Sequence, residues 1–81
     1  MGERANQLNN KIVDIILRLI KEQNKTNEEF ISEITTKTFI TESRITRILD
    51  KTAKRAITIK ELYYISLILK VDIPTILKEI D

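Results

Sequence analysis

Histidine and cysteine are both missing from the 81 residues of this sequence, and these absences exclude many kinds of site. Without cysteine there is no disulfide framework, no thiol nucleophile and no zinc site built from thiolates. Without histidine the commonest general base and the imidazole metal ligand are missing too. Carboxylates remain, but no pair is placed to suggest acid–base catalysis. We therefore expect a protein that is not an enzyme and needs no cofactor.

Glycine and proline are almost absent, since Gly2 and Pro74 are the only examples. β-Hairpins rely on turn pairs such as Asn-Gly, and the sequence has none. A chain of this length forms one domain. We therefore predict an all-α fold, a compact bundle of five short helices, with a polar, flexible leader over residues 1–8 and the folded domain over 9–81.

No apolar run approaches the roughly 18 residues that a transmembrane helix requires. Residues 1–7 are polar and lack the hydrophobic segment of a secretory signal. These features predict a soluble, cytoplasmic protein without a membrane partner, and nothing in the sequence indicates a small-molecule ligand.

Hydrophobic periodicity predicts helices over about residues 8–23, 27–35 or slightly longer, 41–50 and 58–70, followed by a short one that begins after residue 72. The first helix is apolar over more than half its circumference, because Val13 and Leu17 lie off its main stripe. Either neighbouring helices cover both sides of it, or one side meets a partner.

Capping residues precede each later helix. Thr26 and Glu29 have the spacing of a capping box, and Thr41, Thr58 and Asp72 are further N-cap candidates. Residues 35–40 are rich in β-branched side chains and would also suit a short strand. A frayed helix end followed by a turn is favoured, because no partner strand is evident.

Three segments carry a family resemblance: residues 27–34 (NEEFISEI), 39–50 (FITESRITRILD) and 58–73 (TIKELYYISLILKVDI). They resemble the second helix, the turn with its recognition helix, and the fourth helix of the Cro and lambda-repressor-like (XRE) family. The resemblance covers about residues 10–78 and implies a helix-turn-helix domain that binds DNA as a two-fold dimer.

Three departures from the family pattern affect this prediction. Phe39 stands where the family has its turn glycine, and the segment between Ile34 and Ile40 is about four residues longer than the usual turn. Lys70 occupies the usual C-cap glycine position, so this helix is expected to end without a left-handed residue.

The third helix carries the predicted base-reading residues. Arg can donate two hydrogen bonds to guanine, Glu can accept one from cytosine, and Ser or Thr can contact either base. The alternative is a solvated polar face. The predicted base contacts are Glu42, Ser43, Arg44, Thr46 and Arg47.

Further residues are predicted to contact the DNA backbone, because a helix N-terminus and basic side chains both favour phosphate. The alternatives are a plain helix cap and basic groups that only confer solubility. These residues are Thr26, Asn27, Lys51, Lys54, Arg55 and Lys60.

Apolar residues in excess of the core predict a homodimer interface. The candidates are Leu67, Ile68, Ile73, Ile76, Leu77 and Ile80, with Val13 and Leu17 as a second possible surface. The alternative is that all of these residues belong to the core. Of the adjacent tyrosines, one is expected to pack and the other to be exposed.

The leading hypothesis is a sequence-specific transcriptional regulator that binds a palindromic operator in double-stranded DNA as a homodimer. Alternatives are a restriction–modification controller or antitoxin of the same fold, and a helical protein-interaction module without DNA binding. The charge distribution supports the first hypothesis. The net charge of +2 combines +4 over residues 42–60 with −2 over the remainder.

Overall fold

The computed structural model describes the backbone of residues 2–80 and the side chains of residues 7–80. Over this part of the chain all regular structure is α-helical, which confirms the predicted all-α fold of five helices. The helices are α1 (Gly2–Glu22), α2 (Asn27–Lys37), α3 (Glu42–Leu49), α4 (Ile59–Leu69) and α5 (Ile73–Lys78). None of the described helices has the length and apolar character needed to span a bilayer.

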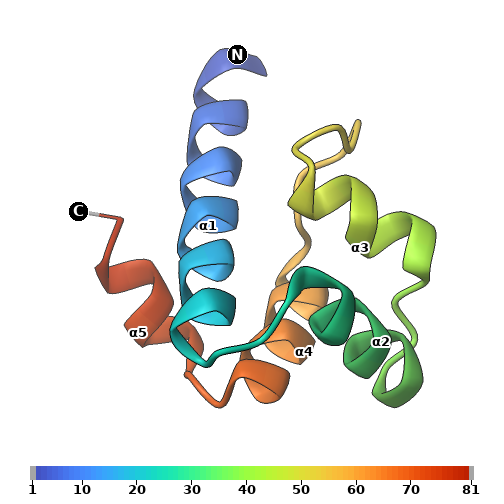
Figure 1. Cartoon of the computed structure of the whole chain (residues 1–81). Helices are drawn as coiled ribbons and strands as arrows, with labels where there is room; N and C mark the ends of the chain where they lie inside the picture. The colour runs from blue at the N-terminus through green and yellow to red at the C-terminus, as the bar shows by residue number, and fades with distance from the viewer. Residues whose placement is uncertain (1, 81) are drawn as a thin grey trace.

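Helix α1 is the longest of the described helices (Figure 1). It packs against α2 and α3 on one side and against α5 on the other. Helix α4 completes the bundle through contacts with α2 and α5. Both sides of α1 are therefore covered within one chain. Val13 is fully buried, which corrects its assignment to a second dimer surface, whereas Leu17 is half-buried.

One apolar core joins all five helices, and isoleucine is its main component. Burial of such side chains is the dominant favourable term in folding. The core contains Val13, Ile15, Ile16, Leu19, Ile20, Phe30, Ile34, Ile40, Ile45, Ile48, Leu49, Leu62, Ile65, Ile68, Leu69 and Ile76.

The predicted N-caps are confirmed at all four positions. Thr26, Thr41, Thr58 and Asp72 each accept a hydrogen bond from the backbone N–H three residues later. Thr26 also forms the predicted capping box with Glu29. These caps fix where four short helices start, in a chain that has few glycines or prolines to interrupt helices.

The start of α1 differs from the prediction, whereas the end of α2 lies within the slightly longer range that was expected. Helix α1 begins at Gly2 rather than near Leu8, so the expected leader boundary at residue 8 falls inside the helix. Helix α2 continues to Lys37, so the extra residues lengthen this helix and leave only residues 38–41 for the turn. Thr38 ends α2 by donating from both its backbone N–H and its hydroxyl to the Ile34 carbonyl. Helix end plus turn, and not a strand, is therefore the structure of residues 35–40.

The C-terminus of α4 corrects a further prediction. Lys70 has φ 60° and ψ 34°, which is the left-handed conformation that the family pattern assigns to glycine. The helix therefore ends with a left-handed residue after all, although that residue is a lysine. Phe39, at the other position of a family glycine, is not among the described residues with positive φ, which are Asn24, Lys51 and Lys70.

We predict that Lys70→Gly raises the free energy of unfolding by up to about 1 kcal/mol, because a non-glycine residue in this conformation carries a steric cost of roughly that size. Urea denaturation of the two proteins measures the difference. Lys70→Ala is the matched control, since it shortens the side chain but keeps the Cβ atom. Equal stability of the glycine and alanine variants would contradict the prediction.

Candidate nucleic-acid interface

Helix α3 presents one polar face to solvent. Ile45, Ile48 and Leu49 are buried against the core, which leaves the opposite side of this short helix exposed. The exposed or half-exposed side chains are those of Glu42, Ser43, Thr46 and Arg47. Four of the five predicted base-contact residues therefore share one accessible face.

Arg44 is the exception, because its guanidinium is directed toward α4. Its Nε and Nη2 donate to the two carboxylate oxygens of Glu61 at 2.8 and 2.9 Å. Its Nη1 and Nη2 donate to the carbonyls of Arg55 and Ala56 at 3.2 and 3.0 Å. These four hydrogen bonds occupy the donors that a guanine contact would use, so the structure does not place Arg44 as a base-reading residue.

Glu61, the partner of Arg44, is a residue of this site that was not predicted from the sequence. Only 8% of the residue is exposed, and Oε1 also accepts from the Thr58 N–H at 2.9 Å in a capping box. The hydrogen bonds from Arg44 lower the pKa of Glu61, against the opposing effect of burial, and the Thr58 hydrogen bonds lower it further. The same pair raises the pKa of Arg44. A carboxylate among the inward positions of an apolar helix was the available signal, since such a group requires a partner.

The loop over residues 50–58 is held to the helices at several points. Lys51 pairs with Asp14 of α1, and the Thr52 N–H donates to the Arg47 carbonyl at 2.9 Å. Further along the loop, the Ile57 N–H donates to the Asn9 side-chain oxygen at 2.9 Å. Together with the contacts of Arg44, these bonds fix the loop beside the start of α3.

A hollow of about 290 Å³ separates the loop from α3, and we call it the basic hollow. Its lining residues are Thr41, Ser43, Arg44, Arg47, Ala53, Lys54 and Arg55. Four of these carry a positive charge and none carries a negative charge. The basic hollow therefore brings predicted base-contact and backbone-contact residues together on one surface.

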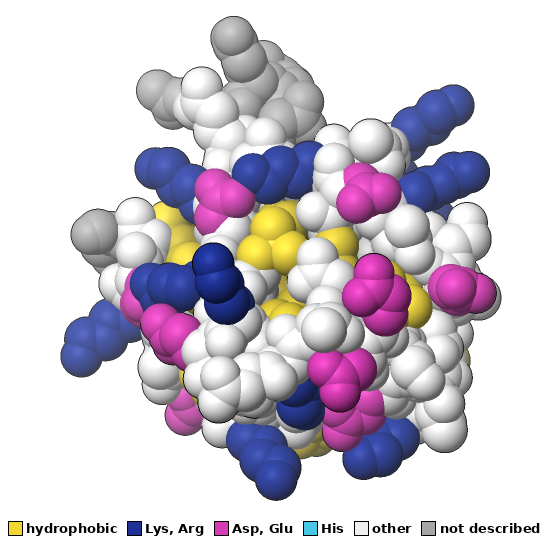
Figure 2. All heavy atoms as spheres, in the orientation of Figure 1, with side chains coloured by type: hydrophobic (Ala, Val, Ile, Leu, Met, Phe, Trp, Pro, Cys, Tyr) yellow, Lys and Arg dark blue, Asp and Glu magenta, His cyan; other side chains and the backbone are white. Residues whose placement is uncertain are grey.

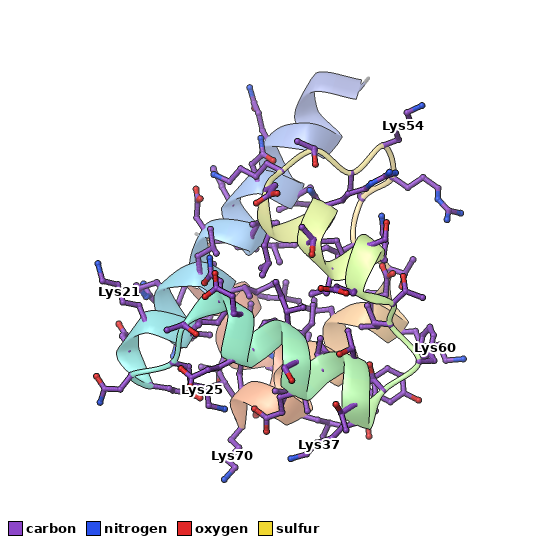
Figure 3. All side chains as sticks on the ribbon, turned by 45° about the vertical axis from the view of Figure 1, so that its right-hand side comes forward. Lys21, Lys25, Lys37, Lys54, Lys60 and Lys70 are labelled. Carbon is purple, nitrogen blue, oxygen red and sulfur yellow. The ribbon has the colours of Figure 1, made fainter. Side chains whose placement is uncertain are left out.

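Three cations that line the basic hollow, and a fourth at the start of α4, have no carboxylate partner among the described residues. Among residues 7–80, Arg47, Lys54, Arg55 and Lys60 form no ion pair. Lysine and arginine side chains project at the upper right of Figure 2, where Figure 1 places this loop. In Figure 3, Lys54 and Lys60 lie on one side of the molecule and Lys21 on the other.

The start of α2 is less suited to phosphate than predicted. The Thr26 N–H and the Glu29 N–H are both satisfied by the capping box. Asn27 is exposed but is followed by two glutamates in the first turn. Glu28 also lines a second hollow of about 270 Å³ together with Glu42. The acidic side chains gather over α2 in Figure 2, so the surface near α3 is divided into a basic side and an acidic side.

The residues predicted to form a dimer interface differ in their exposure. Ile68 and Ile76 are buried in the core of the single chain, which corrects their assignment to an interface. Leu67 and Leu77 are exposed, while Ile73 and Ile80 are half-buried. Ser66, at an inward position, is buried and donates to the Tyr63 carbonyl.

No family model, curated protein or solved structure matches the chain. Among the described residues, no group of three or more carboxylates is arranged to hold a metal ion. The site is therefore interpreted from its own geometry and charge.

We predict that Glu61→Gln lowers the free energy of unfolding at pH 7 by about 2 kcal/mol, because hydrogen bonds to charged groups contribute on this scale. A carboxylate with a lowered pKa stabilises the fold fully above its unfolded pKa of about 4.3. This contribution is lost as the pH falls through the lower folded pKa. The difference between the two proteins should therefore shrink below about pH 4.

Chemical denaturation over a pH series measures this difference. Glu29→Gln is the matched control, since Glu29 occupies the same capping-box position in α2 but is exposed. A difference for Glu61→Gln that stays constant with pH, or that equals the difference for Glu29→Gln, would show that the ion pair does not stabilise the fold.

Proposed function

We propose that this protein is a sequence-specific DNA-binding transcriptional regulator with a helix-turn-helix formed by α2, residues 38–41 and α3. The observation that carries the proposal is the basic hollow, where the exposed face of α3 adjoins a fixed basic loop and whose lining residues include four cations and no carboxylate. A recognition helix needs this combination, because base-edge contacts specify the sequence while phosphate contacts position the protein.

In this proposal α3 enters the major groove by its N-terminal half. Ser43 and Arg47 contact base edges, with Thr46 beside them. Lys54 and Arg55 contact phosphates from the loop, and their positions beside α3 follow from the anchored loop backbone. Glu42 accepts a hydrogen bond from a cytosine amino group. Because Glu42 lies beside the acidic surface, this contact requires the DNA phosphates to lie on the side of the loop.

Lys60 and Lys51 differ in how well they are suited to contact a phosphate. Lys60 is exposed at the start of α4 and serves as a further phosphate contact. Lys51 is a weaker candidate, since its ammonium already pairs with Asp14. At the start of α2, the backbone N–H of Asn27 donates to a phosphate, while Thr26 acts chiefly as the helix cap.

Dimerisation is part of the proposal, because one short helix reads too few base pairs for specificity. A two-fold dimer would place two copies of α3 about 34 Å apart on a palindromic operator. Exposed Leu77 and half-buried Ile73 and Ile80 give α5 an apolar surface for this contact.

The alternative from a different class is a helical protein-interaction module. The acidic surface around Glu28 and Glu42 favours it, because carboxylates near α3 oppose a close approach to phosphate. Selection of bound sequences from a random duplex pool separates the two functions. A palindromic consensus would support the regulator, whereas no enrichment even at low salt would support the interaction module.

We predict that Arg47→Ala weakens binding to the selected duplex roughly 5- to 150-fold, since one bidentate contact between arginine and guanine contributes about 1–3 kcal/mol. Fluorescence anisotropy with a labelled duplex measures the change. The control is Lys21→Ala, which removes an exposed cation on the far side of the molecule. If both variants bind equally, α3 is not the reading element.

A second series distinguishes backbone contacts from base contacts. Lys54→Ala is expected to weaken binding to specific and random duplexes alike and to reduce the salt slope by about one. Lys21→Ala again serves as the control and should leave the slope unchanged. An unchanged slope for Lys54→Ala would place this lysine away from the phosphates.

A further inference from the structure

The outward side of α4 exposes more apolar surface than its short length would suggest. Ile59, Tyr63 and Leu67 follow one another at intervals of four residues and are 75%, 50% and 52% exposed. Their spacing places them on one stripe of the helix. The inward side of α4 is already buried in the core, so this stripe is additional to what the fold requires. We call it the outer face of α4.

Both ends of the outer face continue into further apolar surface. Near the start of α4, the Phe39 side chain is exposed and its ring meets Tyr64 edge-to-face at 5.2 Å. Tyr64 in turn meets Tyr63 at 5.6 Å. Near the end of α4 lies a hollow of about 480 Å³ whose apolar lining includes Leu67, Val71, Ile73 and Pro74. The apolar surface therefore extends beyond the helix itself.

The exposed charges of α4 and of its C-cap residue are positive. Lys60 and Lys70 stand on the exposed side of α4, and the Lys60 Nζ lies 5.1 Å from the centre of the Phe39 ring. Glu61, the acidic residue of α4, is turned inward to Arg44. Asp72 borders the hollow, but its carboxylate accepts from the Thr75 N–H as the cap of α5. A partner that covers the outer face thus meets two lysines at its edges.

We propose that the outer face of α4 docks an acidic amphipathic helix of another protein. Such a helix would place apolar side chains, spaced by three and four residues, over Ile59, Tyr63 and Leu67. Its flanking Asp or Glu side chains would pair with Lys60 and Lys70. The distance along α4 from Ile59 to Lys70 is about 16 Å, which matches three turns of a partner helix.

Charge argues against a second copy of this chain as the occupant. An antiparallel two-fold arrangement sets Lys60 of one copy against Lys70 of the other, and a parallel one sets like residues together. The carboxylate that borders the adjoining hollow, that of Asp72, is already engaged by the Thr75 N–H as the cap of α5, and like charges placed together are costly in an interface. The outer face of α4 is therefore distinct from the dimer contact proposed for α5, although Ile73 borders both.

Two display libraries of helical peptides about 16 residues long test the proposal. They share the same apolar positions but carry either Asp and Glu or Lys and Arg at the flanks. Selection against the full chain should enrich binders from the acidic library only. The best acidic peptide should bind at least tenfold more weakly to Tyr63→Ala/Leu67→Ala and to Lys60→Glu/Lys70→Glu.

The matched control is Leu8→Ala, which truncates a leucine of similar exposure on α1 and should change affinity less than twofold. Circular dichroism confirms that each variant is folded. The proposal is overturned if neither library yields a binder, if basic peptides bind equally well, or if binding survives the substitutions on the outer face.

Two further measurements test whether a different partner occupies the outer face of α4. Self-association in sedimentation that disappears with Tyr63→Ala/Leu67→Ala would assign the outer face to a second copy. Binding to phosphatidylglycerol vesicles that disappears with the same variant, without peptide binding, would assign it to a membrane. Either result overturns the proposal, and neither depends on whether the chain binds DNA.

Discussion

The ion pair between Arg44 and Glu61 is the contact on which the geometry of the candidate interface depends. It joins α3 to α4 across the loop, and the same guanidinium holds the loop through the carbonyls of Arg55 and Ala56. Glu61 simultaneously caps the start of α4 through Thr58. Short helices have little intrinsic stability, so a shared polar contact that fixes two helices and a loop determines how the surface is presented.

This contact also determines which charges are available. Residues 42–60 carry six basic side chains, but Arg44 is paired with Glu61 and Lys51 with Asp14. Of the remaining four, Arg47, Lys54 and Arg55 line the basic hollow, while Lys60 lies over the Phe39 ring at the start of α4. The net charge is small because the exposed basic surface is offset by an acidic surface over α2, while the partly buried ion pair contributes no net charge. In the proposed function, long-range attraction to phosphate would act on the basic surface and would not be set by the net charge.

The sequence predicts the positions of the helices better than it predicts which of their residues form the core and the candidate interface. Hydroxyl and carboxylate caps and hydrophobic periodicity locate all four later helices, because these signals are local. Glu61 illustrates what is not local: its partner lies 17 positions earlier, on another helix. Ile68 and Ile76 were assigned to an interface because periodicity does not reveal which of two apolar sides faces the core. Lys70 adopts a left-handed conformation that its residue type does not favour.

We propose that Arg44 positions the surface that reads bases and does not itself read them. The direct measurement compares the sequences selected from a random duplex pool by the wild type, by Arg44→Lys and by Glu61→Gln. We expect both variants to bind more weakly while selecting the same consensus, since each breaks the same bidentate pair. A change of preferred base at one position with Arg44→Lys, absent with Glu61→Gln, would contradict this account and make Arg44 a base-reading residue.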